Sequence, residues 1–109
     1  MAIPHARSGQ VIDVRPHGPS FTDERTVALF KTEDLEVIRL VLPAGKGMPP
    51  HTVAGEITIQ CIEGRIDVTV DGDSNQLAAG QLIYLARNVL HGVVALEDAS
   101  VLVTIALRR

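Results

Sequence analysis

Short apolar runs rich in β-branched residues alternate with turn-forming residues along the whole chain. Glycine, proline and Asp-Gly sequences separate the runs at short intervals, and such residues mark turns. The runs predict strands at residues 26–30, 35–42, 57–63, 65–70, 82–85, 92–96 and 100–107. No segment of helical length repeats its apolar residues with a period of about 3.6, and residues 20–26 are expected to form one irregular turn at most.

The alternation inside these runs predicts which faces are buried. In residues 65–70 the apolar side chains Ile66, Val68 and Val70 share one face, and polar side chains share the other. This period of two is typical of a half-buried strand. Residues 101–107 are mostly apolar on both faces, which favours a strand covered on both sides. The segment DGDSN (71–75) predicts a hairpin turn, because Asp-Gly supplies the backbone angles that such a turn needs.

The composition is that of one ordinary globular domain. The chain has 109 residues, of which 46% are hydrophobic and 21% charged. Many short strands in a chain of this size favour a β-sandwich or a barrel. We expect a single domain over residues 1–109, with its core at about residues 35–107 and an N-terminal arm at about residues 1–25.

Charge and composition argue against several kinds of partner. The net charge is −3 with acidic and basic residues mixed, so no basic surface for nucleic acid is expected. Aromatic residues make up 3% of the chain, which leaves few platforms for stacked bases. No apolar run is long enough to cross a membrane. Residues 1–10 lack the apolar segment of a signal peptide, so we expect a cytoplasmic protein. Cys61 is the only cysteine, so no disulfide can form within the chain.

Two histidines stand where a predicted loop meets a predicted strand. His51 follows Pro49 and Pro50, whose rings restrict the backbone and present the histidine from a stiff segment. His91 lies at the second such junction. A single histidine in this position is more often a hydrogen-bonded surface residue than a ligand. The pair becomes informative through its spacing from nearby glycines.

The first of these spacings resembles a motif of the cupin family. That motif runs Gly, five residues, His, one residue, His, three or four residues, Glu, six residues, Gly. Gly45, His51 and Gly64 match it in this sequence. Val53 stands at the second histidine position, and Ile57 stands at the glutamate position.

The second spacing resembles the other cupin motif, which runs Gly, five residues, Pro, one residue, Gly, two residues, His, three residues, Asn. Gly80 and His91 match it. Ala86, Asn88 and Ala95 replace the Pro, Gly and Asn. The resemblance covers about residues 35–107, and the matching positions are specific as a set, although each alone would be weak evidence.

The resemblance implies an all-β fold, an antiparallel double-sheet jelly-roll barrel. It also implies a divalent transition metal (Fe, Mn, Ni or Zn) inside the barrel, held in the family by three histidines and one glutamate. Carried over by position, only His51 and His91 remain of those ligands. Two ligands are too few for a tight site, so Glu56, Gln60 or water would have to complete it.

The sequence leaves two registers open for the strand at residues 57–63. Glu56 and Gln60 have the same parity, so a regular strand turns both to the same side. A bulge after the Ala54-Gly55 pair would let Glu56 reach the interior. In the opposite register Ile57, Ile59 and Cys61 line the barrel, and burial of apolar surface favours this second arrangement.

Other side chains are candidates for lesser roles. Tyr84 and Arg39 are candidate contacts for a small-molecule ligand. Met48 is expected to cap an apolar edge, and Cys61 to be a buried structural cysteine rather than a metal ligand. Several strands are apolar on both faces, so we expect a homodimer that covers apolar surface which a monomer would expose.

Three functions stay open at this point. The first is a barrel that binds a small molecule, with a divalent metal held by two histidines. The second is a metal-dependent enzyme of dioxygenase, isomerase or decarboxylase type. The third is a metal-free sensor or structural dimer. The sequence does not decide whether the protein is an enzyme, because one fold of this kind hosts many chemistries.

Overall fold

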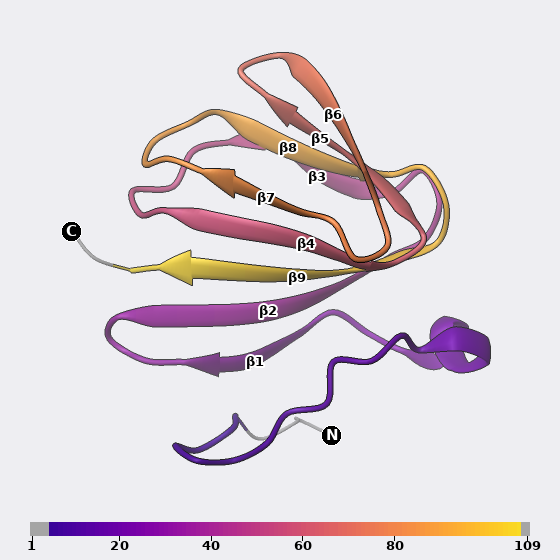
Figure 1. The fold of residues 1–109 in the computed structure, drawn as a ribbon, viewed down its shortest axis with the longest axis vertical. Helices are drawn as coiled ribbons and strands as arrows, with labels where there is room; N and C mark the ends of the chain where they lie inside the picture. Colours follow the sequence, from indigo (N-terminus) through magenta and orange to yellow (C-terminus); the bar gives the residue numbers. More distant parts are fainter. Residues whose placement is uncertain (1–4, 108–109) are drawn as a thin grey trace.

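Two antiparallel β-sheets stacked face to face make up the computed structural model, which describes residues 5–107 (Figure 1). The large sheet has the order β1 (Val27–Lys31), β2 (Leu35–Leu42), β9 (Ala99–Ala106), β4 (Ile57–Glu63), β7 (Leu82–Leu85). The small sheet has the order β3 (Gly47–His51), β8 (His91–Ala95), β5 (Arg65–Val70), β6 (Asp73–Ala78). From β2 onward each strand is followed by one in the other sheet, except at the β5–β6 hairpin, so the predicted jelly-roll fold is confirmed.

The two strands that the sequence pattern did not predict, β3 and β6, are the edges of the small sheet. β3 contains Pro49 and Pro50, which cannot donate backbone hydrogen bonds and are therefore tolerated at an edge. β6 is mostly polar and follows a tight turn at Asp71 and Gly72, where φ is 50° and 89°. Two positive φ angles match a two-residue hairpin turn. The predicted turn is therefore present but shorter than expected.

The hydrophobic core lies between the two sheets. The largest fully buried side chains in it are Ile59, Cys61, Ile66, Val68 and Val101. The aliphatic members are alternate residues of β4, β5 and β9, as the period of two predicts. On β4 the inward residues are the apolar set, so the second of the two registers is the one adopted.

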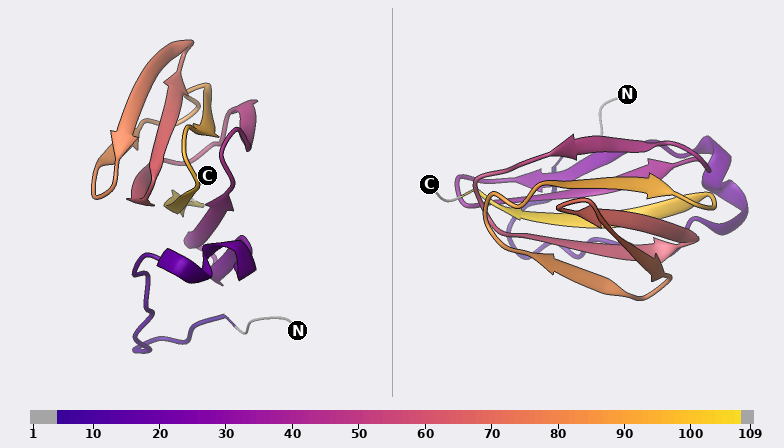
Figure 2. Two further views of the ribbon diagram at one scale, coloured as in Figure 1. Left: turned by 90° about the vertical axis from the view of Figure 1, so that its right-hand side faces the viewer. Right: turned by 90° about the horizontal axis from the view of Figure 1, so that it is seen from above.

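The N-terminal segment runs outside the large sheet, and Figure 2 shows it apart from the stacked strands. It includes a short 3-10 helix, η1 (Gly18–Asp23), close to the irregular turn expected at residues 20–26. The amide of Ala6 donates a hydrogen bond to the carbonyl oxygen of Leu29 on β1. Residues 1–4 of the expected arm lie outside the described residues.

A buried ion pair fastens the end of this segment to the sheet. Arg39 on β2 is 4% exposed, and its Nη2 lies 3.5 Å from the Glu63 Oε2. The same nitrogen donates to the Arg15 carbonyl oxygen at 2.5 Å and to the Ser100 Oγ at 3.1 Å. Arg39 thus connects the N-terminal segment to β4 and β9 on the outer face of the large sheet.

Glu63 completes this attachment from the other side. Its two carboxylate oxygens accept hydrogen bonds from the amides of His17 at 2.8 Å and Gly18 at 3.1 Å. The Ser100 hydroxyl donates to it at 2.6 Å. Burial raises the pKa of Glu63, but these hydrogen bonds outweigh that effect and leave the pKa below its ordinary value. The carboxylate is therefore charged at neutral pH.

Between residues 5 and 107 no helix is long and apolar enough to span a membrane.

Candidate functional site

A small cavity opens between the sheets at the end where β3 finishes and β8 starts. Its volume is about 60 Å³, room for roughly two water molecules. Two of its lining side chains are histidines and the others are apolar: Ile38, Leu40, Met48, His51, Val53, Ile57, Ile59, His91, Val93, Val103 and Ile105. Ligand pockets are usually about 300–1,000 Å³, so the cavity as it stands admits an ion or one end of a small molecule.

His51 and His91 meet directly across the pairing of β3 with β8. They are opposite each other in the register, and their ring centroids lie 4.6 Å apart at an interplanar angle of 49°. His91 is 4% exposed, whereas His51 is exposed at the mouth. The structure therefore brings the two predicted histidines to one cavity.

A β-bulge in β3 makes this arrangement possible. Met48 pairs with Val93 and His51 pairs with His91, so three steps along β3 match two steps along β8. A regular strand would turn residues three apart to opposite faces, and the bulge restores them to the same face. Met48 therefore faces the cavity beside His51. The sequence signal for this was the Pro49-Pro50 pair, which interrupts the regular hydrogen-bond ladder.

Backbone carbonyl groups orient both imidazole rings in the same way. The Nδ1 of His51 lies 3.1 Å from the Pro49 carbonyl oxygen, and the Nδ1 of His91 lies 3.0 Å from that of Val89. A carbonyl oxygen can only accept, so each Nδ1 carries the proton and donates it. In the neutral ring the Nε2 lone pair is then free, which is the arrangement typical of metal-binding histidines.

The spacing of the rings also suits a shared ion. With metal–nitrogen bonds of about 2.0–2.1 Å, two imidazoles on one ion at roughly 90–110° place their centroids roughly 4.5–5 Å apart. The observed centroid distance is 4.6 Å. This ring spacing is compatible with a shared ion, for which the two histidines would supply part of a coordination sphere.

The positions at which the family motif has its other ligands are apolar walls here. Val53 and Ile57 both line the cavity. The amide of Asn88 donates to the Val53 carbonyl oxygen at 2.9 Å, and this bond ties together the two loops at the mouth. Among the described residues, no group of three or more His, Cys, Asp or Glu side chains could hold a metal ion.

The structure does not bring Glu56 or Gln60 to the histidines. Glu56 is exposed and accepts a hydrogen bond from the Tyr84 hydroxyl. Gln60 pairs with Leu82 and Leu102 on the outer face of the large sheet. Ile57 and Ile59, which lie between them on β4, turn inward because that register buries the isoleucines. The expectation that either polar side chain completes the site is not supported by this geometry.

Cys61 is also not available as a ligand. Its side chain is fully buried, and its Sγ lies 3.4 Å from the Glu63 carbonyl oxygen and 3.6 Å from that of Gly64. Burial raises the pKa of the thiol, and a protonated thiol is a poor metal ligand. This agrees with the expected structural role.

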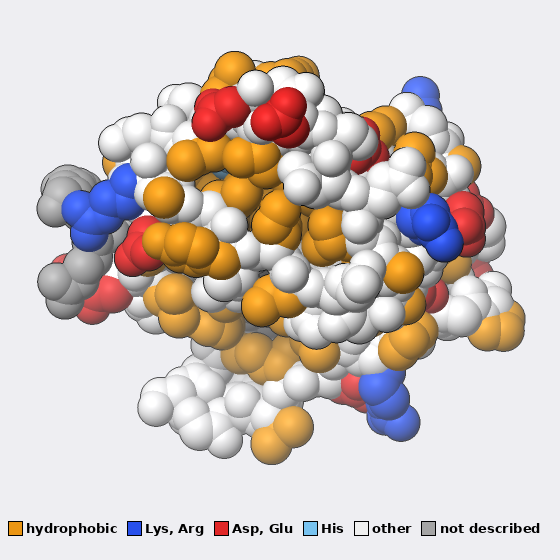
Figure 3. All heavy atoms as spheres, turned by 45° about the horizontal axis from the view of Figure 1, so that its top comes forward, with side chains coloured by type: hydrophobic (Ala, Val, Ile, Leu, Met, Phe, Trp, Pro, Cys, Tyr) orange, Lys and Arg blue, Asp and Glu red, His pale blue; other side chains and the backbone are white. Residues whose placement is uncertain are grey.

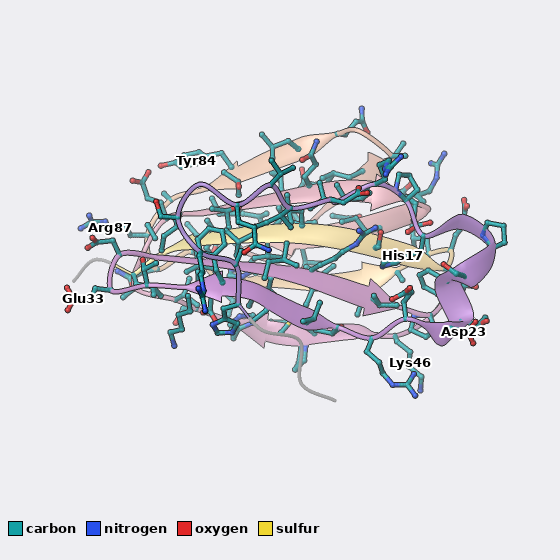
Figure 4. The ribbon with its side chains drawn as sticks, turned by 90° about the horizontal axis from the view of Figure 1, so that it is seen from below. His17, Asp23, Glu33, Lys46, Tyr84 and Arg87 are labelled. Carbon is teal, nitrogen blue, oxygen red and sulfur yellow. The ribbon has the colours of Figure 1, made fainter. Side chains whose placement is uncertain are left out.

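Tyr84 and Arg39, the predicted ligand contacts, both lie outside the cavity lining. Tyr84 is 59% exposed on β7, and Figure 4 shows it with Arg87 at the end of the molecule opposite His17. The hydrogen bond to Glu56 raises the pKa of the Tyr84 hydroxyl. Arg39 faces the outer side of β2, opposite Leu102 on β9, whereas its neighbours Ile38 and Leu40 face the cavity. Its role here is to hold the N-terminal segment.

Some large apolar side chains are exposed on the surface. With the top of the molecule tilted forward, Figure 3 shows hydrophobic side chains gathered across the middle, and acidic side chains at the upper rim. Within residues 5–107 the exposed large apolar residues are Val11, Met48, Leu82, Tyr84, Leu90 and Leu96. Met48 is the one of these that also lines the cavity.

Solved structures show the same fold. An RmlC-like cupin from Shewanella frigidimarina is 23% identical with a TM-score of 0.71, and covers 77% of this chain and 76% of its own. An RmlC-like cupin from Desulfovibrio desulfuricans is 28% identical with a TM-score of 0.70, over 94% and 98%. Salicylate 1,2-dioxygenase from Pseudoaminobacter salicylatoxidans is 16% identical with a TM-score of 0.68, over 73% and 24%.

Sequence comparison points the same way. No curated protein sequence gives a significant match. The family model described as Cupin domain matches residues 38–106, which is more than half of the chain and contains all strands except β1 and the first residues of β2. The match includes both histidines and every strand that contributes to the cavity. The protein therefore belongs to the cupin domain family.

Proposed function

We propose that the protein binds a small molecule at the open end of its barrel, where His51 and His91 hold a transition-metal ion. The observation that carries this proposal is the shared cavity of the two rings, with both Nδ1 atoms committed to backbone carbonyl oxygens. This leaves two Nε2 lone pairs for one ion, and open coordination positions for water or a ligand. His51 is exposed, so a ligand can approach from solvent.

The donor set narrows the choice of metal. Imidazole suits Zn, Cu, Fe and Ni, whereas Mn favours the carboxylates that this cavity lacks. A metal held here would act as a Lewis acid toward a bound carbonyl or similar oxygen group. The remaining walls are apolar, so they would exclude water and favour the carbon part of a ligand.

An enzymatic role is the second candidate. The similarity to salicylate 1,2-dioxygenase is the observation that favours it. At 16% identity that similarity concerns the fold. The apolar Val53 and Ile57 at the missing ligand positions favour binding over catalysis that needs a fixed three- or four-residue metal centre.

Metal titration tests the proposal. We expect the purified apoprotein to bind Ni(II), with His51→Ala and His91→Ala each weakening the affinity by at least the roughly 10–100-fold that loss of a supporting residue costs. Isothermal titration calorimetry measures the affinities. His5→Ala is the matched control because His5 is exposed and outside the cavity. Equal affinity in the wild type and in a variant lacking both cavity histidines would refute the site.

We also propose that the protein pairs through the outer face of β9, β4 and β7. Apart from Glu63, which contacts the N-terminal segment, the residues of these strands that pair on this face are uncharged: Thr58, Gln60, Leu82, Tyr84, Leu102 and Thr104. Protein interfaces are depleted of charge at their centres. Light scattering at micromolar concentration is expected to give the mass of a dimer, and Leu82→Asp the mass of a monomer. A monomeric wild type would contradict the proposal.

A further inference from the structure

Met48 lines the cavity together with the two histidines, and its side chain carries a sulfur atom that could bind a metal. The bulge in β3 turns Met48 and His51 to the same face, and their partners on β8 are next-but-one neighbours. Both residues line the same cavity of about 60 Å³. Met48 is 40% exposed, so its side chain lies at the mouth and not deep in the core.

We propose that the Met48 thioether is the third ligand of this site, and that the site is therefore selective for copper(I). The inference rests on the proposed metal binding by His51 and His91. A methionine side chain is unbranched with three rotatable bonds. The Met48–Val93 pair lies next to the His51–His91 pair on the same face of β3 and β8. The methionine side chain can therefore reach an ion held between the two histidine rings.

The chemistry of the donors favours this metal. Soft thioether sulfur selects Cu(I), and imidazole also suits copper. All three side chains are neutral ligands, and the described cavity lining contains no carboxylate. Zinc in structural sites takes four ligands, and non-haem iron takes a carboxylate with its two histidines. Neither requirement is met by this lining.

The charge of the ion points to the same conclusion. Bringing a charge into an apolar cavity costs free energy unless opposite charge compensates it, and this cost grows with the square of the charge. A monovalent ion therefore enters a cavity of aliphatic walls at a much lower cost than a divalent ion. His91 is 4% exposed, so part of the site is shielded from solvent.

The edge position of Met48 has a simpler explanation, in which the side chain only covers apolar surface. The two explanations differ in what Met48→Leu does. Leucine and methionine have similar volume, so this exchange preserves the packing and removes the sulfur alone. Leucine would still cover the apolar surface, but it has no sulfur atom with which to bind a metal.

The test is an anaerobic titration of the apoprotein with Cu(I) against a competing chromogenic chelator. We expect Met48→Leu to weaken Cu(I) binding at least about tenfold, as loss of groups around a metal does, and to change Ni(II) binding less than about twofold. X-ray absorption of the Cu(I)-loaded wild type should show a sulfur neighbour that is absent in Met48→Leu. The chain has two methionines and one cysteine, so a Cys61→Ala variant should keep this signal.

The outcomes separate this inference from the proposed function. Unchanged Cu(I) affinity in Met48→Leu, a sulfur signal lost only in Cys61→Ala, or a wild type that binds Ni(II) but not Cu(I) would each overturn the role of Met48. None of these results would contradict metal binding by His51 and His91. His51→Ala and His91→Ala test that site separately, through the loss of Ni(II) binding.

Discussion

Replacing Glu63 by alanine is expected to lower the free energy of unfolding by about 3 kcal/mol, near the lower end for breaking a buried ion pair. The lower end applies because 16% of the Glu63 side chain is exposed. The change leaves Arg39 buried at 4% exposure without its carboxylate partner. The Nε of Arg39 is already buried without a hydrogen-bond partner among the described residues. Urea denaturation followed by circular dichroism measures the loss.

Two variants serve as controls for this prediction. Arg15→Ala removes an ion pair with Asp13 whose side chains are 85% and 56% exposed, so it should change the stability little. A double variant in which Glu63→Leu accompanies Arg39→Met removes both charges and should be more stable than Glu63→Ala. Equal losses in all three variants would show that the ion pair does not act as a unit.

The same residue makes the stability depend on pH. The pKa of Glu63 in the folded protein lies below its ordinary value of 4.5. Its contribution is therefore fully present above about pH 4.5 and is lost as the pH falls through the lower pKa of the folded state. Denaturation of the wild type and of Glu63→Gln at several pH values should show a smaller acid-induced loss in the variant.

Replacing Gly64 by alanine is expected to cost at least about 3 kcal/mol, as overpacking and backbone strain act together. Gly64 joins β4 to β5 with φ of +79°, and a Cβ there would lie 2.1 Å from the Asp98 carbonyl oxygen. A backbone oxygen cannot move aside without shifting the turn before β9. The change should sharply lower the midpoint of thermal unfolding or prevent folding.

Gly45→Ala is the matched control for Gly64. Gly45 has a similar φ of +84°, but a Cβ there would meet nothing within 4 Å. Its substitution should cost only the backbone strain of a left-handed residue, roughly 1–2 kcal/mol. If both variants lose the same stability, the close approach to Asp98 contributes nothing. Both glycines belong to the cupin motif. Comparing the two variants therefore separates two reasons for a glycine there, the left-handed backbone and the lack of space for a Cβ.

Much of the fold could be predicted because strands with one buried face alternate apolar and polar residues with a period of two. β2, β4, β5 and β7 have the residues that the alternation predicts. The edge strands β3 and β6 could not be predicted in this way, since edge strands bury little and tolerate proline and polar residues. The register of β4 followed from the same burial argument, which favoured inward isoleucines over an inward Glu56.

The site was only partly predictable. His51 and His91 could be found from their spacing to glycines, because that spacing reflects the strand pairing that brings them together. Arg39 could not be placed, because its burial depends on Glu63 and the N-terminal segment, which are distant in sequence. Met48 was expected at an apolar edge. Its direction toward the histidines depends on a bulge that side-chain alternation does not reveal.

The two prolines of β3 also affect how copies of this protein meet. An edge strand with free amide groups is a template on which another chain can add a strand and begin aggregation. Pro49 and Pro50 occupy two of the five positions of β3 and have no amide hydrogen to offer. The segment that carries His51 is thus also protected against unwanted strand addition, and substitutions of these prolines would expose the protein to self-association at the end that holds the cavity.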